Sequence, residues 1–315
     1  MSGIVLCFLS IIRPVIIKKY RKQINNTTYI DFNKLNNGYT LIEGVKNNNF
    51  VNNIVLKQMK RFFLIVLAIF FAMGVSAQES ATVISADRPG MATGVDVMPF
   101  KSVQWETGFQ YDYSSGAHSI TLPTTLFRLG ITCFAELRVE YDGTLASADK
   151  KQWEYAVEPL VVGTKIKVFE GTENEKLQWL PAVSFLINLA IPSTPDLAKT
   201  THVAPSAYLL FHHNATDWLS IDYNIGAEWD GVSAQPATFL ALCLGFGITD
   251  KAGAFLESYN YITDYGRRPG GSANLDFGFT YLVQPRVQLD VYAAFNCQDP
   301  ASSANVGLGV AWMIY

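Results

Sequence analysis

Cysteine is scarce in this chain of 315 residues, which contains only four. Cys133, Cys243 and Cys297 lie beyond residue 77, an odd number with no two at the short spacings of metal ligands. This pattern argues against a disulfide framework and against a zinc-type site. We therefore expect neither a disulfide nor a metal ion, and we predict no cofactor.

The chain also lacks an apolar run long enough for a transmembrane helix, which needs ~20 residues. The run from Phe62 to Ala72 stops well short of that length. It follows the basic Met59-Lys60-Arg61 and precedes the small residues Val75-Ser76-Ala77, an order typical of a secretory signal peptide. We predict a signal peptide over 59–77, with cleavage between Ala77 and Gln78. No cysteine follows the cleavage site, which argues against a lipoprotein anchor.

Residues 1–58 precede this signal, although a signal peptide belongs at the N-terminus. They are rich in Asn and basic residues and show no sustained period. One interpretation is an upstream extension from a mistaken start, with translation beginning at Met59. The alternative is a membrane segment over 4–17, which Arg13-Pro14 interrupts. We favour the first and exclude 1–58 from the fold prediction.

Basic charge is lacking beyond the signal. Residues 78–315 carry 14 basic and 25 acidic residues, a formal net charge of −11. Nucleic-acid binding requires a basic surface that neutralises phosphates, so nucleic acid is excluded as a partner. The chain also has no Gly-rich phosphate loop.

Strict alternation of apolar and polar residues is abundant instead. From Val103 to Tyr113 one set is Val103, Trp105, Thr107, Phe109, Tyr111 and Tyr113, and the interleaved set is polar or Gly. Successive side chains on a strand point to opposite faces, so this strand has one apolar face. Aromatic residues at both ends of that face are typical of a strand that crosses a membrane.

Turn signals divide the remainder into a series of similar segments. The predicted strands are 102–114, 119–131, 134–143, 155–169, 177–190, 203–213, 218–229, 237–248, 253–262, 272–283, 286–296 and 304–315. Most match the ~9–11 residues of a tilted membrane-crossing strand. Tight connections alternate with mostly longer ones, as in barrels with short periplasmic turns and long external loops.

These observations predict an all-β fold, a transmembrane up-and-down antiparallel β-barrel of about 12 strands over 102–315. We expect it in the outer membrane of a Gram-negative-type bacterium, exported by the secretory pathway, with the lipid bilayer as its surroundings. The last strand alternates Leu308, Val310, Trp312 and Ile314 with small residues. That pattern resembles the C-terminal signal of the barrel-assembly machinery, which we predict as a partner.

If the apolar faces contact lipid, the polar faces line the interior, because charges on the lipid face are costly. The charged residues predicted to line the lumen and set selectivity are Glu106, Glu136, Arg138, Glu140, Lys165, Lys167, Asp222, Glu228, Asp276 and Asp290. Acids outnumber bases, which predicts a weak preference for cations. The alternative is a salt-bridge network that fills a narrow barrel. Glu158 and Glu257 share a face with apolar neighbours, so either a bulge turns them inward or the register differs there.

The segment 78–101 precedes the first strand and contains the turn-forming run Asp87-Arg88-Pro89-Gly90. One interpretation is a periplasmic N-terminal segment in which Asp87 and Arg88 satisfy each other or nearby backbone. The other folds the segment into the lumen as a small plug, with Arg88 bound to luminal acids.

A resemblance is carried by residues near the start of the barrel. These are Ala86-Asp87-Arg88-Pro89-Gly90, Thr93-Gly94, Pro99, Gln104, Glu106, Gly108, Leu129-Gly130 and Glu136-Leu137-Arg138. The chain resembles the outer-membrane transporter family labelled "Putative MetA-pathway of phenol degradation". The resemblance is sharpest over about 86–140. It implies export or uptake of small, including aromatic, compounds, and it assigns no functional residues.

Three functions compete. We predict an outer-membrane channel or transporter for small-molecule solutes with a narrow, acid-rich lumen, and no enzymatic activity. A closed structural or adhesive barrel that binds a partner through external loops is the alternative. A lipid hydrolase is the third, but it needs a nucleophile, a base and an orienting group. His212 and His213 have no Ser-rich motif nearby.

Overall fold

The computed structural model describes residues 83–147, 152–171, 180–192, 202–265, 270–298 and 303–314. The predicted upstream extension, the signal peptide and the cleavage positions Ala77 and Gln78 lie outside these residues. The described residues contain no helix long and apolar enough to cross a membrane.

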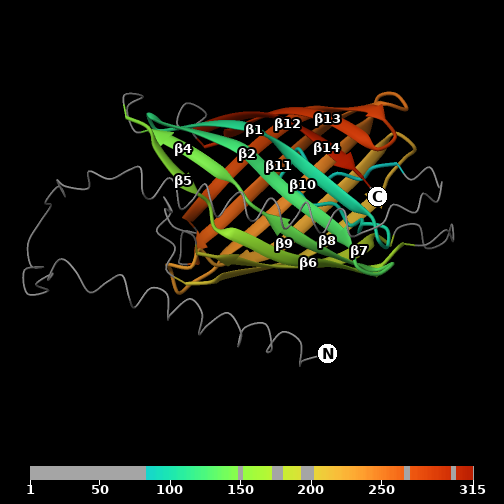
Figure 1. The fold of residues 1–315 in the computed structure, drawn as a ribbon, viewed down its shortest axis with the longest axis horizontal. Coiled ribbons are helices and arrows are strands. Elements are labelled where there is room, and N and C mark those ends of the chain that lie inside the picture. Colours follow the sequence, from blue (N-terminus) through green and yellow to red (C-terminus); the bar gives the residue numbers. More distant parts are fainter. Residues whose placement is uncertain are drawn as a thin grey trace, which may run out of the picture. The chain divides into compact units, whose positions relative to one another are not determined.

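Within the described ranges, fourteen strands form one sheet (Figure 1). Their bounds are β1 (Val103–Ser114), β2 (Ala117–Gly130), β3 (Ala135–Glu140), β4 (Gly143–Ser147), β5 (Glu154–Val157), β6 (Leu160–Phe169), β7 (Ala182–Ile191), β8 (Ala204–Asn214), β9 (Leu219–Glu228), β10 (Ala237–Gly247), β11 (Ala252–Asp264), β12 (Gly270–Gln284), β13 (Val287–Asn296) and β14 (Ser303–Met313). Each pairs antiparallel with its neighbours.

The sheet closes on itself because β1 pairs with both β2 and β14. β3 and β4 both pair with β2, while β6 pairs with β3 and β5 with β4. Consecutive strands β3 and β4 therefore make one crossing of the wall together, and β5 and β6 together make the next. The result is a closed antiparallel barrel of twelve crossings, and the predicted fold class is confirmed.

The two interrupted crossings explain one anomaly of the sequence. Tyr141 and Asp142 separate β3 from β4, and Glu158 and Pro159 separate β5 from β6. The breaks face each other, with the Glu158 amide donating to the Asp142 carbonyl at 3.0 Å. Glu158 breaks the apolar alternation because it lies in this irregular stretch rather than within a regular strand.

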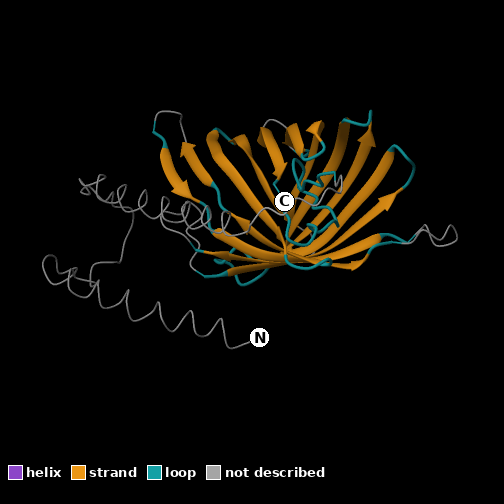
Figure 2. Cartoon of the chain, turned by 45° about the vertical axis from the view of Figure 1, so that its right-hand side comes forward, coloured by secondary structure: helices purple, strands orange, loops and turns teal. Residues whose placement is uncertain are grey.

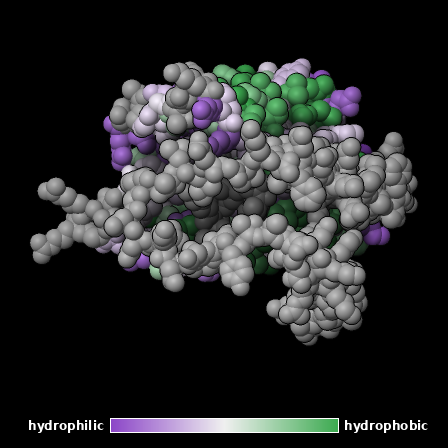
Figure 3. All heavy atoms as spheres, turned by 60° about the vertical axis from the view of Figure 1, so that its left-hand side comes forward, coloured by the Kyte–Doolittle hydropathy of each residue, from purple (hydrophilic) through white to green (hydrophobic). Residues whose placement is uncertain are grey.

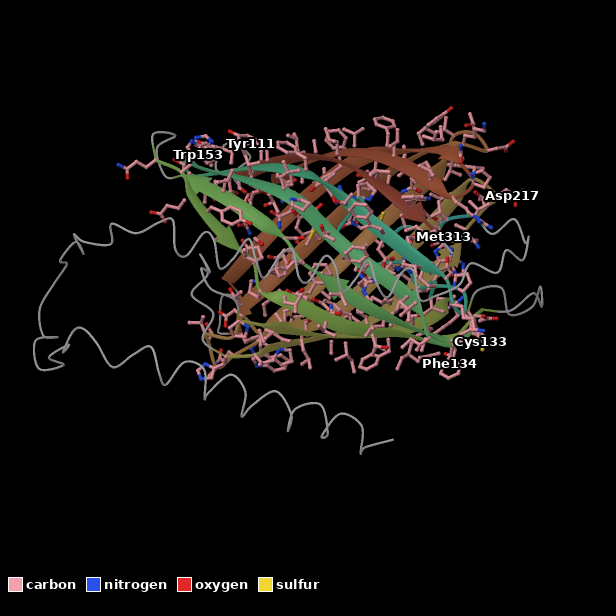
Figure 4. All side chains as sticks on the ribbon, viewed as in Figure 1. Tyr111, Cys133, Phe134, Trp153, Asp217 and Met313 are labelled. Carbon is pink, nitrogen blue, oxygen red and sulfur yellow. The ribbon has the colours of Figure 1, made fainter. Side chains whose placement is uncertain are left out.

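The connections sort by end of the barrel, as the sequence predicts. In Figure 4, Tyr111 and Trp153 lie at one end, and Cys133, Asp217 and Met313 at the other. The second end holds the tight turns after β2, β8, β10 and β12, together with the start of β1 and the end of β14. We call it the turn end and the opposite one the loop end.

The outer surface of the barrel is apolar. Large hydrophobic side chains stand exposed along the middle of the strands, among them Leu242 at 50%, Phe279 at 56% and Leu308 at 57%. The part of the wall visible at the top of Figure 3 carries a hydrophobic patch, drawn in green. A folded chain in water would bury most of this area, so the outer face fits a hydrocarbon environment.

Residues 83–101, here called the inner segment, contain no helix or strand and lie inside the ring of strands (Figure 2). The segment begins and ends at the turn end. There the Ile84 amide donates to the Pro285 carbonyl at 2.8 Å, and the Lys101 amide donates to the Gly130 carbonyl at 3.0 Å. The chain thus enters the barrel, loops through its interior and returns to start β1.

Candidate functional site

The ten charged residues predicted to line the lumen alternate with exposed apolar residues on their strands. Six of them are buried: Glu106, Glu136, Arg138, Lys165, Asp276 and Asp290. The other four, Glu140, Lys167, Asp222 and Glu228, are half-buried. Because the outer face of the barrel is apolar, these side chains point into the barrel, and all of the six buried ones except Asp276 form ionic contacts there.

Two enclosed charges were missed or misplaced by the sequence argument. Arg128 on β2 is 1% exposed and was missed. The alternation with its neighbours Phe127 and Leu129 already indicates an inward position for it. Glu257 on β11 is also 1% exposed. It belongs to the same inward face as Phe255 and Tyr259, so the assumption that this apolar face met lipid was wrong.

Asp87 of the inner segment binds three cationic side chains from the wall. Lys165 Nζ lies 3.0 Å from both carboxylate oxygens, Arg128 Nη1 lies 3.6 Å from Oδ1, and Arg138 Nη1 donates to Oδ2. Burial alone would disfavour the ionised carboxyl. The charges of Arg128, Lys165 and Arg138 outweigh that effect and hold the pKa of Asp87 below its usual range.

Acids of the wall complete this cluster. Glu136 lies 2.9 Å from Arg128 Nε, 3.1 Å from Arg138 Nη1 and 3.9 Å from Lys165 Nζ. Glu106 lies 3.3 Å from Arg128 Nη1. Each buried charge of this cluster therefore has an opposite charge beside it, which is the condition for burying ions at tolerable cost.

Arg88 extends in the opposite direction, across to β13. Its Nη2 lies 3.2 Å from Asp290 Oδ1, and its Nη1 donates to Thr124 Oγ1 at 2.9 Å. The guanidinium lies over Gly108 and Gly309, where an added Cβ would come within 2.6 Å and 2.4 Å of Nη2. Two glycines on paired strands thus create the slot that holds this side chain.

The wall also supplies hydrogen bonds for the backbone of the inner segment. Glu106 accepts from the amides of Asp87 and Arg88, and Glu136 accepts from that of Met98 at 2.7 Å. Glu257 accepts from the amides of Met91 and Ala92. A segment without secondary structure must find partners for its polar groups elsewhere, and the luminal carboxylates provide them.

Carbonyl groups of the segment are bound in the same way. Lys165 donates to the carbonyls of Gly94 and Asp96, at 2.8 and 3.0 Å. Asn224 uses both ends of its amide, accepting from the Thr93 amide at 2.7 Å and donating to the Thr93 carbonyl at 3.1 Å. The inner segment is therefore fixed along its length rather than at one point.

Apolar contacts add to this. Ile84 and Met98 pack with Ala311 and Met313 of β14. Val95 packs with Leu186 of β7 and Leu210 of β8. These side chains contact two nearly opposite parts of the wall, so the segment extends across the interior.

Cavities lie on both sides of the inner segment. One of about 420 Å³ is lined by residues 85–90 and by the turn-end halves of β8–β12, including His212, Asp222 and Phe255. A second of about 180 Å³ is lined by Thr124, Arg138 and Glu140. Asp87, Arg88 and Gly90 line both, so this part of the segment separates the two spaces.

Charge is distributed unevenly around the wall. The inward bases lie on β2, β3 and β6, and the sequences of β7–β14 contain no Lys or Arg. The inward acids of β9–β13 are Asp222, Glu228, Glu257, Asp276 and Asp290. One side of the lumen is therefore mixed in charge, and the other is purely acidic.

Aromatic rings line the lumen toward the loop end. Phe239 of β10 lies between Tyr208 and Tyr261, with ring centroids 5.8 and 5.2 Å away. Tyr259 lies edge-on to Tyr261 at 6.4 Å. Aromatic rings present both an apolar face and, in tyrosine, a hydroxyl group, so this wall can contact flat apolar solutes.

The comparisons with known proteins agree with this architecture. The family model described as "Putative MetA-pathway of phenol degradation" matches residues 86–314. No curated protein sequence matches the chain.

Among solved structures, an outer membrane channel from Pseudomonas putida F1 is similar over 72% of this chain and 99% of its own, with a TM-score of 0.51 and 10% identity. The NanC porin covers 66% of this chain and 98% of its own, with a TM-score of 0.47 and 11% identity. The KdgM porin in complex with disordered oligogalacturonate is similar over 67% of this chain and 99% of its own, with a TM-score of 0.45 and 10% identity. At such low identity the Pseudomonas likeness shows the barrel fold alone.

Proposed function

The chain belongs to the family described as "Putative MetA-pathway of phenol degradation", and from this premise we propose that it is an outer-membrane channel for small solutes. The turn end faces the periplasm and the loop end faces the outside, as in barrels with short periplasmic turns. The outer-membrane lipid bilayer surrounds the strands. The inner segment acts as a plug that narrows the lumen.

One observation carries this proposal. The wall is apolar outside and charged inside, and its lumen contains spaces of about 420 and 180 Å³ that share part of the inner segment as lining. A solid barrel, filled by its own strand side chains, would leave no such spaces. A barrel of twelve crossings lies between filled eight-stranded barrels and open porins of 16–18 strands, which favours a narrow pathway.

The purely acidic wall of β9–β13 supports the expected preference for cations. Asp222 lines the cavity at the periplasmic end, and Asp276 lies deeper, paired in register with Glu257. Charged side chains of one sign set the ion preference of a pore. Glu106, Glu136 and Asp290 contribute less, because they bind the inner segment.

The aromatic wall supports a solute class. Tyr208, Phe239 and Tyr261 offer ring surface within the lumen, and flat solutes stack on such rings. Together with a family name that refers to phenol degradation, this favours small aromatic compounds as solutes.

The closed-barrel alternative gains support from the plug itself, whose contacts span the lumen. The hydrolase alternative gains none. His212 lies 2.8 Å from Asp222 and 3.1 Å from Asn214. These partners provide no hydroxyl or thiol nucleophile, so we propose that the chain is not an enzyme.

We also propose that the chain is exported by the secretory pathway. Cleavage after Ala77 would leave a chain that begins at Gln78, and the closing strand β14 would be read by the barrel-assembly machinery. N-terminal sequencing of protein purified from outer membranes tests the cleavage site, since a chain that begins at any residue other than Gln78 would contradict it.

The experiment for the channel is single-channel recording in planar bilayers. The chain from Gln78 is compared with a variant in which residues 84–98 are replaced by a Gly/Ser linker of equal length. We expect small current steps from the first and larger steps from the second. Silence from both, with barrels that show folded mobility on unheated gels, would overturn the channel and favour the closed barrel.

A further inference from the structure

We propose that Arg128, Arg138 and Lys165 form a binding site for the carboxylate of a solute, and that Asp87 occupies this site when the plug is in place. The inference rests on the proposed function, because a solute reaches the site through the lumen. It adds a ligand chemistry, an organic monoanion, that the acidic character of the lumen does not suggest.

The geometry is that of an anion site. Three cations from three wall elements, β2, β3 and β6, converge on one carboxylate. That carboxylate is not part of the wall: it belongs to the inner segment, which has no strand pairing to hold it. Asp87 therefore stands where the carboxylate of a bound molecule would stand.

Acids of the wall contact the three cations independently of Asp87, and they hold the two arginines by hydrogen bonds. Glu136 contacts all of them, and Glu106 contacts Arg128. Glu140 lies 3.6 Å from Arg138 Nη2, which leaves Nη1 directed toward Asp87 and Glu136. A site whose groups are fixed in advance loses less free energy on binding than one that must order itself.

Lys165 depends more than the two arginines on the inner segment for its hydrogen-bond partners. Its hydrogen bonds reach the two oxygens of Asp87 and the carbonyls of Gly94 and Asp96, all of which belong to the inner segment. Glu136, at 3.9 Å, is too distant for a hydrogen bond. When the segment moves away, the ammonium group lies beside two guanidinium groups, and an anion between them relieves their repulsion.

The site can be approached from both directions. Asp87 lines the cavity of about 420 Å³ on one side and that of about 180 Å³ on the other, and Arg138 also lines the smaller one. A solute carboxylate can thus compete with Asp87. Because it binds only when Asp87 has left, it shifts the population toward the displaced plug, and ligand binding is coupled to opening.

The test measures binding in detergent micelles, where conduction plays no part. Benzoate is titrated calorimetrically into the wild-type protein, into Asp87→Asn and into Asp96→Asn, with benzamide as the uncharged probe. Asp96 is a matched control because its side chain is exposed and contacts Lys167, while its backbone carbonyl, which accepts from Lys165, is unchanged by the substitution. We expect Asp87→Asn to bind benzoate tighter than wild type by roughly tenfold or more, since one charge-assisted hydrogen bond contributes on this order.

Asp96→Asn should bind like wild type, and benzamide should not distinguish the three proteins. Lys165→Met introduced into Asp87→Asn should abolish the gain. Equal benzoate affinity in folded wild type and Asp87→Asn would overturn the proposal.

A second measurement uses the wild-type protein in case the variant does not fold. Benzoate, but not benzamide, should accelerate cleavage of the inner segment by proteinase K, and no acceleration would count against the site. The two proposals fail separately. A conducting barrel with unchanged benzoate affinity contradicts only the anion site, whereas tight benzoate binding with silent bilayers contradicts only the channel.

Discussion

Arg88 and Asp290 are 202 residues apart in the chain, and the Arg88 Nη2 atom lies 3.2 Å from the Asp290 Oδ1 atom. One residue belongs to the inner segment and the other to β13. Thr124 and the glycine slot complete the binding of the guanidinium. This contact fixes the segment on the side of the lumen opposite to Lys165.

Replacing Arg88 by Ala should release this side of the inner segment. Loss of a hydrogen bond between charged groups costs about 1.5–3 kcal/mol. We therefore expect open events in bilayer recordings to increase by roughly tenfold. Asp290→Asn should have a smaller effect in the same direction, and an unchanged open probability in both variants would show that Arg88 does not hold the segment.

Gly309→Ala tests the slot by steric means. A Cβ at this position would come within 2.4 Å of Arg88 Nη2, so the guanidinium must move. Gly247→Ala is the control, because an added Cβ there meets no atom closer than 3.8 Å. Proteinase K should cleave the inner segment faster in the first variant and at the wild-type rate in the second.

Neutralising the acidic wall should change ion selectivity without releasing the segment. Asp222→Asn and Asp276→Asn together should move the cation-to-anion permeability ratio toward unity, because the field of these charges favours cations. Reversal potentials under a salt gradient provide the measurement. A ratio that stays at the wild-type value would place the selective region elsewhere in the lumen.

The pH dependence of the closed state follows from Asp87. A carboxyl group whose pKa is lowered by docking contributes above its ordinary pKa of ~3.9, and this contribution is lost as the pH falls through the lowered value. The difference in open probability between wild type and Asp87→Asn should therefore be constant from pH 7 to 5. It should shrink only below about pH 4, and a difference that shrinks already near pH 6 would contradict the lowered pKa.

Placement of the lipid face can be tested by inserting a charge. Leu242 is 50% exposed in the middle of β10, and arginine at the midplane of a barrel costs about 2–4 kcal/mol. Leu242→Arg should lower the free energy of unfolding in urea by that amount. Thr280→Arg, which points the same charge into the larger cavity, should cost less.

The barrel could be predicted because its wall obeys a simple period. On β1 each inward residue lies between two outward ones. The same alternation holds on β14, where Leu308 and Trp312 face outward. It failed on β11, where Phe255 and Tyr259 face inward beside Glu257. Hydropathy alone cannot distinguish a ring that contacts lipid from one that fills a lumen.

The sequence offered a luminal plug as one of two placements for the inner segment, but it could not decide between them, for a different reason. Residues 83–101 have no period, and their conformation is set by side chains from distant strands, such as Asn224 at Thr93 and Glu257 at Ala92. Only tertiary contacts determine where such a segment lies. For Arg128 the alternation of β2 is sufficient, because Phe127 and Leu129 on either side of it belong to the opposite face.

The hydrogen bonds between the wall and the inner segment have a consequence for protein engineering. Strand number sets the bore of an ordinary porin, so changing its permeability means rebuilding the part embedded in lipid. Here the segment inside the lumen is a short, continuous peptide that precedes β1, and its docking groups are side chains. A library of exchanged N-terminal sequences on an unaltered scaffold could therefore yield pores of graded bore, each inserted in the membrane in the same way.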